Sequence, residues 1–156
     1  MDMQEIAVLL HNVRSAHNVG SVFRTSDAAG VSKIFLTGYT PVPIDRFNRV
    51  QKDIAKTALG AEKIVPWEYR KTPTMIARLK RAGWRIVGVE QDSRSRDYRS
   101  FSVTSPTLFI FGNEVKGLSS ALRALCDELI EIPMRGTKES LNVSVAAGII
   151  LFSALH

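Results

Sequence analysis

The sequence predicts an α/β domain in which a mostly parallel sheet carries helices on both faces. Short apolar runs suited to buried strands alternate with segments of helical periodicity, an order typical of parallel sheets. The length of 156 residues suits one domain, and neither a repeat nor a low-complexity tract divides it. We therefore expect a single domain over residues 1–156.

Five runs are expected to form strands because each is four or five residues long and largely apolar. They are Ile6–Leu10, Lys33–Thr37, Ile86–Glu90, Leu108–Phe111 and Leu129–Ile132. The helices expected between and after them are Val19–Ala29, Val50–Leu59, Thr74–Ala82, Ser120–Leu125 and Val143–Leu155.

Helix caps and loops follow from local residue types. Asn18 is expected to cap the first helix and Ser140 the last, because both side chains can accept hydrogen bonds from a helix's first turn. The segment Gly38–Phe47 holds two prolines and is expected to be a long, mobile flap.

Composition excludes several classes of protein. Hydrophobic residues make up 45% and charged residues 23%, the balance of a soluble globular protein. Cys126 is the single cysteine, which excludes an internal disulfide, and the histidines lack metal-ligand spacing. The first twenty residues resemble no secretion signal, and the longest apolar run falls short of the roughly 20 residues that cross a bilayer. We expect a cytoplasmic protein with no metal and no membrane segment.

The positive charge is concentrated in one part of the chain. The formal net charge is +6, and the segment from Arg70 to Arg99 carries nine cations against three anions. Such a segment indicates a polyanionic partner, of which nucleic acid is the usual one. The alternative is a solvated basic helix and loop. Candidate contacts to nucleic acid are Arg94, Arg96 and Arg99.

Three of the expected strands run into similar polar or glycine-containing loops, Val89–Asp92, Phe111–Glu114 and Ile132–Gly136. Ligands of parallel sheets bind beyond the carboxyl ends of the strands, and glycine lets a backbone approach a ligand closely. Ordinary turn chemistry explains any one of these loops. If the three converge, they form a pocket to which Glu90 and Asn113 contribute.

The first helix offers a candidate phosphate site. Gly20, Ser21 and Arg24 share one helix face near its start, and Arg14 lies in the preceding loop. The alternative for Arg24 is a surface salt bridge to Asp27.

The last helix, Val143–Leu155, has almost no polar face. A helix that is apolar nearly all round is buried in a core or in a subunit contact. We expect a homodimer through this helix, in which replacing Ile150 with Asp gives monomer or aggregate.

Three segments together resemble one known family. Asn12–Thr25 (NVRSAHNVGSVFRT), Phe111–Ser119 (FGNEVKGLS) and Ile132–Ser144 (IPMRGTKESLNVS) are similar, in this order, to the three motifs of the SpoU/TrmH branch of the SPOUT methyltransferases. The resemblance covers essentially the whole chain. It implies S-adenosylmethionine as methyl donor, an RNA ribose 2′-hydroxyl in tRNA or rRNA as acceptor, a C-terminal deep trefoil knot, and an active site assembled at a dimer interface.

The resemblance also implies roles for matching residues. The catalytic set is Arg24, Asn18, Glu114, Ser140 and Asn142, and the cofactor is expected to contact Gly112, Ile132, Met134, Ser140 and Leu141 in addition to Glu90 and Asn113. Arginine holds its own proton above pH ~12, so we expect Arg24 to bind a phosphate and stabilise developing alkoxide charge.

The sequence leaves two alternative functions open. One is a non-catalytic RNA-binding homodimer that keeps the fold, which the joint presence of the five catalytic candidates argues against. The other is methylation of a base nitrogen, as in other SPOUT branches, although the Asn–Arg set of the first motif favours ribose. No separate RNA-binding domain is expected, so Arg14 and the basic segment, or a partner protein, would recognise the RNA.

Overall fold

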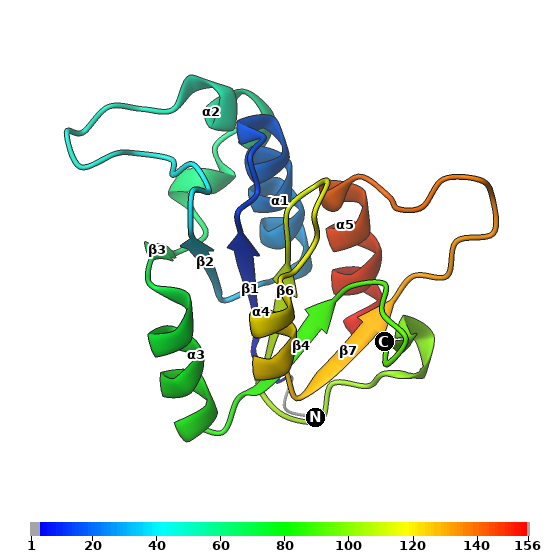
Figure 1. Cartoon of the computed structure of the whole chain (residues 1–156). Coiled ribbons are helices and arrows are strands. Elements are labelled where there is room, and N and C mark those ends of the chain that lie inside the picture. The colour runs from blue at the N-terminus through cyan, green and yellow to red at the C-terminus, as the bar shows by residue number, and fades with distance from the viewer. Residues whose placement is uncertain (1–3, 156) are drawn as a thin grey trace.

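The computed structural model describes residues 4–155 and contains one seven-stranded sheet in which every pair of neighbouring strands is parallel. The strand order is β3-β2-β1-β6-β4-β7-β5, so the chain crosses over the sheet repeatedly (Figure 1). The predicted α/β fold with a parallel sheet is thereby confirmed. The strands are β1 (Ile6–His11), β2 (Lys33–Thr37), β3 (Trp67–Tyr69), β4 (Arg85–Val89), β5 (Arg96–Asp97), β6 (Thr107–Phe111) and β7 (Glu128–Glu131).

Five α-helices connect and cover these strands. They are α1 (Ala16–Ala29), α2 (Lys52–Ala58), α3 (Thr72–Arg81), α4 (Ser120–Leu125) and α5 (Val143–Ala154), with short 3-10 turns at Ala61–Lys63 and Tyr98–Ser100. One core contains residues of α1, α2 and α5, and the second contains residues of α3 and α4. The helices thus lie on both faces of the sheet, as predicted.

Alternation along the strands builds these two cores. In β1, Val8 and Leu10 pack on the side of α1 and α5, whereas Ala7 and Leu9 pack on the side of α3 and α4. Successive strand side chains point to opposite faces, so a central strand covered on both sides must be apolar throughout. The continuous apolar runs of the sequence reflect this requirement.

Both predicted caps are wrong. The N-cap of α1 is Ser15, whose Oγ accepts a hydrogen bond from the Asn18 amide at 3.2 Å. The N-cap of α5 is Asn142, whose Oδ1 accepts from the Ser144 amide at 2.9 Å. Each segment holds two residues able to cap a helix, and the extended backbone that precedes the first turn decides between them.

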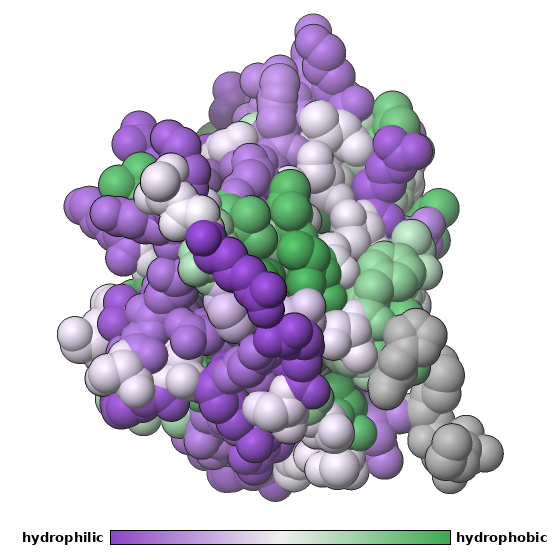
Figure 2. Space-filling view, turned by 90° about the vertical axis from the view of Figure 1, so that its right-hand side faces the viewer, coloured by the Kyte–Doolittle hydropathy of each residue, from purple (hydrophilic) through white to green (hydrophobic). Residues whose placement is uncertain are grey.

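The last helix is only partly covered within the subunit. Ile150 is 2% exposed in the core, so it is not available for a subunit contact, and Ile150→Asp would bury a charge inside the fold instead. The apolar residues that α5 does expose are Val145, at 50%, and Phe152, at 42%. Figure 2 looks onto this side of the molecule, where hydrophobic surface is bordered by hydrophilic residues.

The segment expected to be a flap is anchored at its base. Thr40 is buried, and its Oγ1 donates to backbone oxygens of Leu10 and Thr37 and accepts from the Val13 amide. Mobility of the segment stays a prediction, as does the trefoil knot. None of the helices within residues 4–155 has the length and hydropathy that crossing a membrane requires.

Candidate functional site

The three polar loops, whose convergence the sequence left open, do converge. They surround a cavity of about 270 Å³ beyond the carboxyl ends of β4, β6 and β7. Every residue predicted to contact a cofactor lines it: Glu90, Gly112, Asn113, Ile132, Met134, Ser140 and Leu141. The convergence follows from the strand order, which makes β4 the neighbour of both β6 and β7. That these residues bind a cofactor stays a prediction.

Two glycines allow the loops to approach each other so closely. A Cβ on Gly112 would lie 2.7 Å from the carbonyl carbon of Gly117. This is closer than a Cβ and a backbone atom can approach without one of the loops moving. Gly117 has a φ of +67°, and a Cβ there would collide with the Glu90 carboxylate. The cavity wall therefore requires glycine at both positions.

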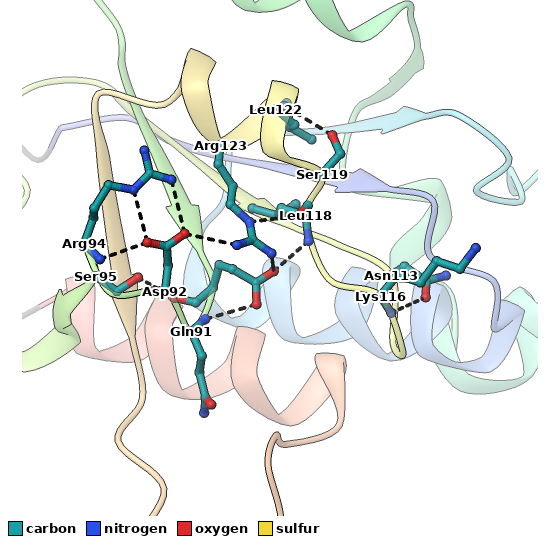
Figure 3. Close-up of polar contacts among 11 residues, drawn as sticks. Gln91, Asp92, Arg94, Ser95, Asn113, Lys116, Leu118, Ser119, Leu122 and Arg123 are labelled. Carbon is teal, nitrogen blue, oxygen red and sulfur yellow. Dashed lines mark hydrogen bonds and ion pairs between the residues drawn. The ribbon is translucent and has the colours of Figure 1, made fainter.

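An arginine that sequence analysis missed joins two of these loops (Figure 3). Arg123, on α4, donates from Nε to the Leu118 carbonyl at 2.8 Å and from Nη1 to Asp92 at 3.0 Å. The Leu118 amide donates to Glu90 Oε2 at 2.6 Å, which closes the link to the cavity wall. Nothing in the local sequence distinguishes Arg123 from a surface arginine, because Asp92 is 31 residues away in the chain and Leu118 contributes only its backbone carbonyl.

Asp92 is the shared carboxylate of this cluster. Hydrogen bonds from the Arg94 side chain and amide, with a further bond from Arg123, hold the pKa of Asp92 well below its usual range. Asp92 therefore stays ionised and ties the 90–95 loop to α4.

Glu114 anchors the start of α1 to the cavity loop. Its carboxylate accepts hydrogen bonds from the amides of Arg14 at 3.0 Å and Ser15 at 2.9 Å, and from Asn18 Nδ2 at 3.3 Å. Burial alone would raise the pKa of Glu114, but the amide hydrogen bonds outweigh it and lower the pKa. Two of the predicted catalytic residues, Glu114 and Asn18, are therefore in direct contact.

Asn113 is held entirely by the protein. Its Oδ1 accepts from the amides of Val115 and Lys116, and its Nδ2 donates to the Asn12 carbonyl and the Tyr39 hydroxyl. The side chain fastens the cavity loop to the β1–α1 loop. The side-chain carboxamide of Asn113 is occupied by these hydrogen bonds, so we expect a ligand in the cavity to contact the backbone of Asn113 instead.

Arg24 lies apart from these residues. It faces a separate surface hollow on α1 together with Lys56 of α2 and Phe152 of α5. Among the ion pairs of residues 4–155 there is none from Arg24, so the alternative salt bridge to Asp27 is not formed. The structure therefore brings Asn18, Glu114 and Ser140 to the cavity or its rim and leaves Arg24 outside it. Asn142 caps α5 next to Ser140.

The three predicted RNA-binding arginines of the basic segment are each paired with a carboxylate, whereas Arg14 makes no ion pair among residues 4–155. Arg94 pairs with Asp92, Arg96 with Glu128 and Arg99 with Asp97. Their side chains remain 63%, 49% and 60% exposed, so they can still reach a phosphate, but part of their charge is balanced locally. Asp92 and Asp97 lie two residues from their arginines in the chain, whereas Glu128 of β7 is a distant partner that the charge count alone does not reveal.

Comparison with known proteins identifies the family. The model of the SpoU rRNA Methylase family matches residues 5–152, nearly the whole chain. This chain belongs to that family. Its three motifs are the segments that carry the cavity and the start of α1.

Individual relatives agree with this assignment. The 23S rRNA (guanosine-2′-O-)-methyltransferase RlmB of Pseudomonas syringae is 34% identical over 152 residues, which are 97% of this chain and 58% of that protein. The tRNA (guanosine(18)-2′-O)-methyltransferase of Thermus thermophilus is 36% identical over 154 residues, which cover 96% of this chain and 74% of that enzyme. An AdoMet-bound rRNA methyltransferase from Sinorhizobium meliloti superposes with a TM-score of 0.87 at 32% identity, over 98% of this chain and 56% of that one. The chain thus spans less than two thirds of several relatives that it matches.

Proposed function

We propose that this SpoU family chain transfers a methyl group from S-adenosylmethionine to a ribose 2′-hydroxyl of rRNA or tRNA. The observation that carries the proposal is the convergence of the second and third family motifs on one cavity, with the first motif anchored to it by Glu114. The AdoMet-bound relative supports the choice of methyl donor. Such RNA substrates point to a cytoplasmic enzyme.

The lining of the cavity suits this donor. Four glutamates and one lysine line it, so its charge favours a cationic ligand such as a sulfonium. Val89, Ile132 and Leu141 supply apolar surface for a planar base. Gly112 and Gly117 also line the cavity, so part of its wall is backbone without a side chain.

Within this reaction the protein supplies mainly position and charge. S-adenosylmethionine, when bound, provides a methyl group activated by the sulfonium. Ser140, which lines the cavity, and the neighbouring Asn142 orient polar groups near the reacting atoms, and Asn18 is held toward the cavity rim by Glu114. Arg24 binds the phosphate next to the acceptor and stabilises negative charge that develops on the ribose oxygen.

We further propose that the active enzyme is a homodimer through the exposed apolar face of α5. Val145 and Phe152 lie seven residues apart, which places both on one side of the helix, and apolar surface of this kind favours burial. Arg24 shares its hollow with Phe152 and lies outside the cavity of its own subunit. A second copy docked on this face would bring Arg24 to the partner subunit's cavity, which explains its position.

RNA contacts are assigned to Arg14 and to the three arginines at 94, 96 and 99. Arg14 is exposed next to the Glu114 anchor, and the other three remain about half exposed or more. Exposed guanidiniums of this kind can contact RNA phosphates.

The deciding experiment is transfer of tritiated methyl groups from labelled S-adenosylmethionine to total rRNA and tRNA, followed by nucleoside analysis. We expect a 2′-O-methylnucleoside, with Arg24→Ala as the inactive control. A base-methylated nucleoside would establish the base-nitrogen alternative. RNA binding without any methyl incorporation would establish the non-catalytic alternative, and either result overturns the proposal.

A further inference from the structure

The loop between β2 and α2 ends in an ordered tip, which we define as residues 44–50. An isolated antiparallel bridge pairs Ile44 with Val50, and the Asp45 amide donates to the Arg49 carbonyl at 3.1 Å. Asp45 Oδ1 accepts from the amides of Phe47 at 2.9 Å and Arg49 at 3.0 Å. Asn48, with a φ of +61°, completes the reversal of the chain. The tip is therefore a closed turn with its own hydrogen bonds.

This turn displays an aromatic ring to solvent. The Phe47 side chain is 63% exposed. Burying an apolar side chain of this size would stabilise the fold, so its exposure suggests a role in binding. The guanidinium carbons of Arg46 and Arg49 lie 4.9 Å and 5.0 Å from the centre of its ring. An exposed ring flanked by two guanidiniums combines a stacking surface with two phosphate-binding groups.

The tip belongs to the same edge of the molecule as the cavity. Its loop follows the carboxyl end of β2. Figure 1 shows this loop projecting beyond the upper edge of the sheet, and the 112–119 loop extends from the same edge. The base of the loop is fastened to the site, because Asn113 donates to the Tyr39 hydroxyl at 3.0 Å and the Tyr39 amide donates to Asn12 Oδ1 at 3.1 Å. A strand of RNA lying across this edge would meet both features.

We propose that the tip 44–50 is an RNA-docking element on which an unpaired base of the substrate stacks against Phe47. Arg46 is the guanidinium that can leave the ring when the base arrives, because it is exposed and makes no ion pair among residues 4–155, whereas Arg49 Nε is held by Asp45 Oδ2 at 2.8 Å. Cation–π contacts at exposed sites are weak, so this displacement costs little. The displaced guanidinium then pairs with a neighbouring phosphate. Duplex RNA offers no free base face, so the element selects single-stranded segments such as loops and ends. This inference rests on the proposed RNA substrate and names how part of that substrate is held.

The test compares Phe47→Ala with variants matched to it. The probe is a fluorescent single-stranded RNA of about 16 nucleotides, studied alone and annealed to its complement. Phe47→Ala should weaken single-strand binding by about tenfold, the scale of losing one base–aromatic stack, and should leave duplex binding within twofold. Phe47→Trp should restore binding, and its emission should be quenched by the RNA. Ile64→Ala, which removes a side chain that is 67% exposed elsewhere, is the control and should change nothing.

Several outcomes would overturn the inference. Unchanged single-strand binding by Phe47→Ala, or equal weakening on the duplex, would show that Phe47 does not stack on a base. A change in sedimentation with Phe47→Ala would assign the tip to a contact between copies of this chain. If the wild-type chain methylates rRNA but ignores the probe, this inference fails and the proposed function stands. If it does neither, both fail.

Discussion

The Glu114 anchor allows a prediction with a magnitude. Glu114→Ala removes the acceptor of the Arg14 and Ser15 amides and of Asn18 Nδ2. Hydrogen bonds to a charged group contribute about 1.5–3 kcal/mol each, and partial exposure of this site reduces each amide bond to about 1 kcal/mol. The free energy of unfolding should therefore fall by about 2 kcal/mol at pH 7, which lowers the Tm of a domain of this size by about 4–8 °C.

The lowered pKa of Glu114 also predicts that the Tm difference between wild type and Glu114→Ala depends on pH. Because the folded protein lowers the pKa of Glu114, its stabilisation is complete above the unfolded pKa of about 4.3 and is lost as pH falls through the lower folded pKa. The Tm difference between wild type and Glu114→Ala should be full at pH 7 and should shrink below pH ~4. Glu114→Gln, which keeps an acceptor oxygen without the charge, should recover part of the loss at pH 7.

Thermal unfolding followed by circular dichroism in a pH series measures both effects. Glu139→Ala is the matched control, because Glu139 lines the same cavity but makes no side-chain hydrogen bond or ion pair among residues 4–155. An unchanged Tm for Glu114→Ala at pH 7, or a loss as large as that of the control, would refute the anchoring role. A Tm difference that does not shrink as the pH falls below ~4 would refute the electrostatic part of the explanation alone.

Four further predictions test the site. Arg24→Ala should leave the affinity for S-adenosylhomocysteine in isothermal titration unchanged and reduce methyl transfer by roughly 100-fold; full turnover would remove Arg24 from the mechanism. Phe152→Asp should convert the dimer to a monomer in sedimentation and leave the Tm nearly unchanged, because Phe152 is exposed. Ile150→Asp should lower the Tm, because Ile150 is buried in the core of the subunit. A wild-type monomer at micromolar concentration would contradict the proposed dimer. Gly112→Ala should weaken cofactor affinity by about tenfold or more, because its Cβ meets the Gly117 backbone and the cavity loops must separate; unchanged affinity would mean that the loops shift freely. Changing Arg94, Arg96 and Arg99 together to Ala should weaken RNA binding. The slope of log binding constant against log salt concentration should become shallower by fewer than about three units, because each arginine already pairs with a carboxylate. An unchanged slope would show that the segment does not contact RNA phosphates.

Local sequence was sufficient for the main elements of the fold. The five predicted strands and five predicted helices all occur, with their ends displaced by a few residues, because buried parallel strands demand uninterrupted apolar runs. The strands β3 and β5 were missed, since two or three residues at a sheet edge carry no readable period. The caps at Ser15 and Asn142 were missed because backbone angles, which the residue types do not specify, chose between two capable side chains.

For the candidate site, the sequence by itself determined which residues belong to the motifs, and only the tertiary structure decided which of them meet. The order β6-β4-β7 brings together loops from residues 90, 112 and 134, because parallel neighbours end at the same edge. The contact of Arg123 with Asp92, the pairing of Arg96 with Glu128, and the separation of Arg24 from the cavity all depend on distances between chain segments. Such distances are set when the sheet assembles, and spacing along the chain does not encode them.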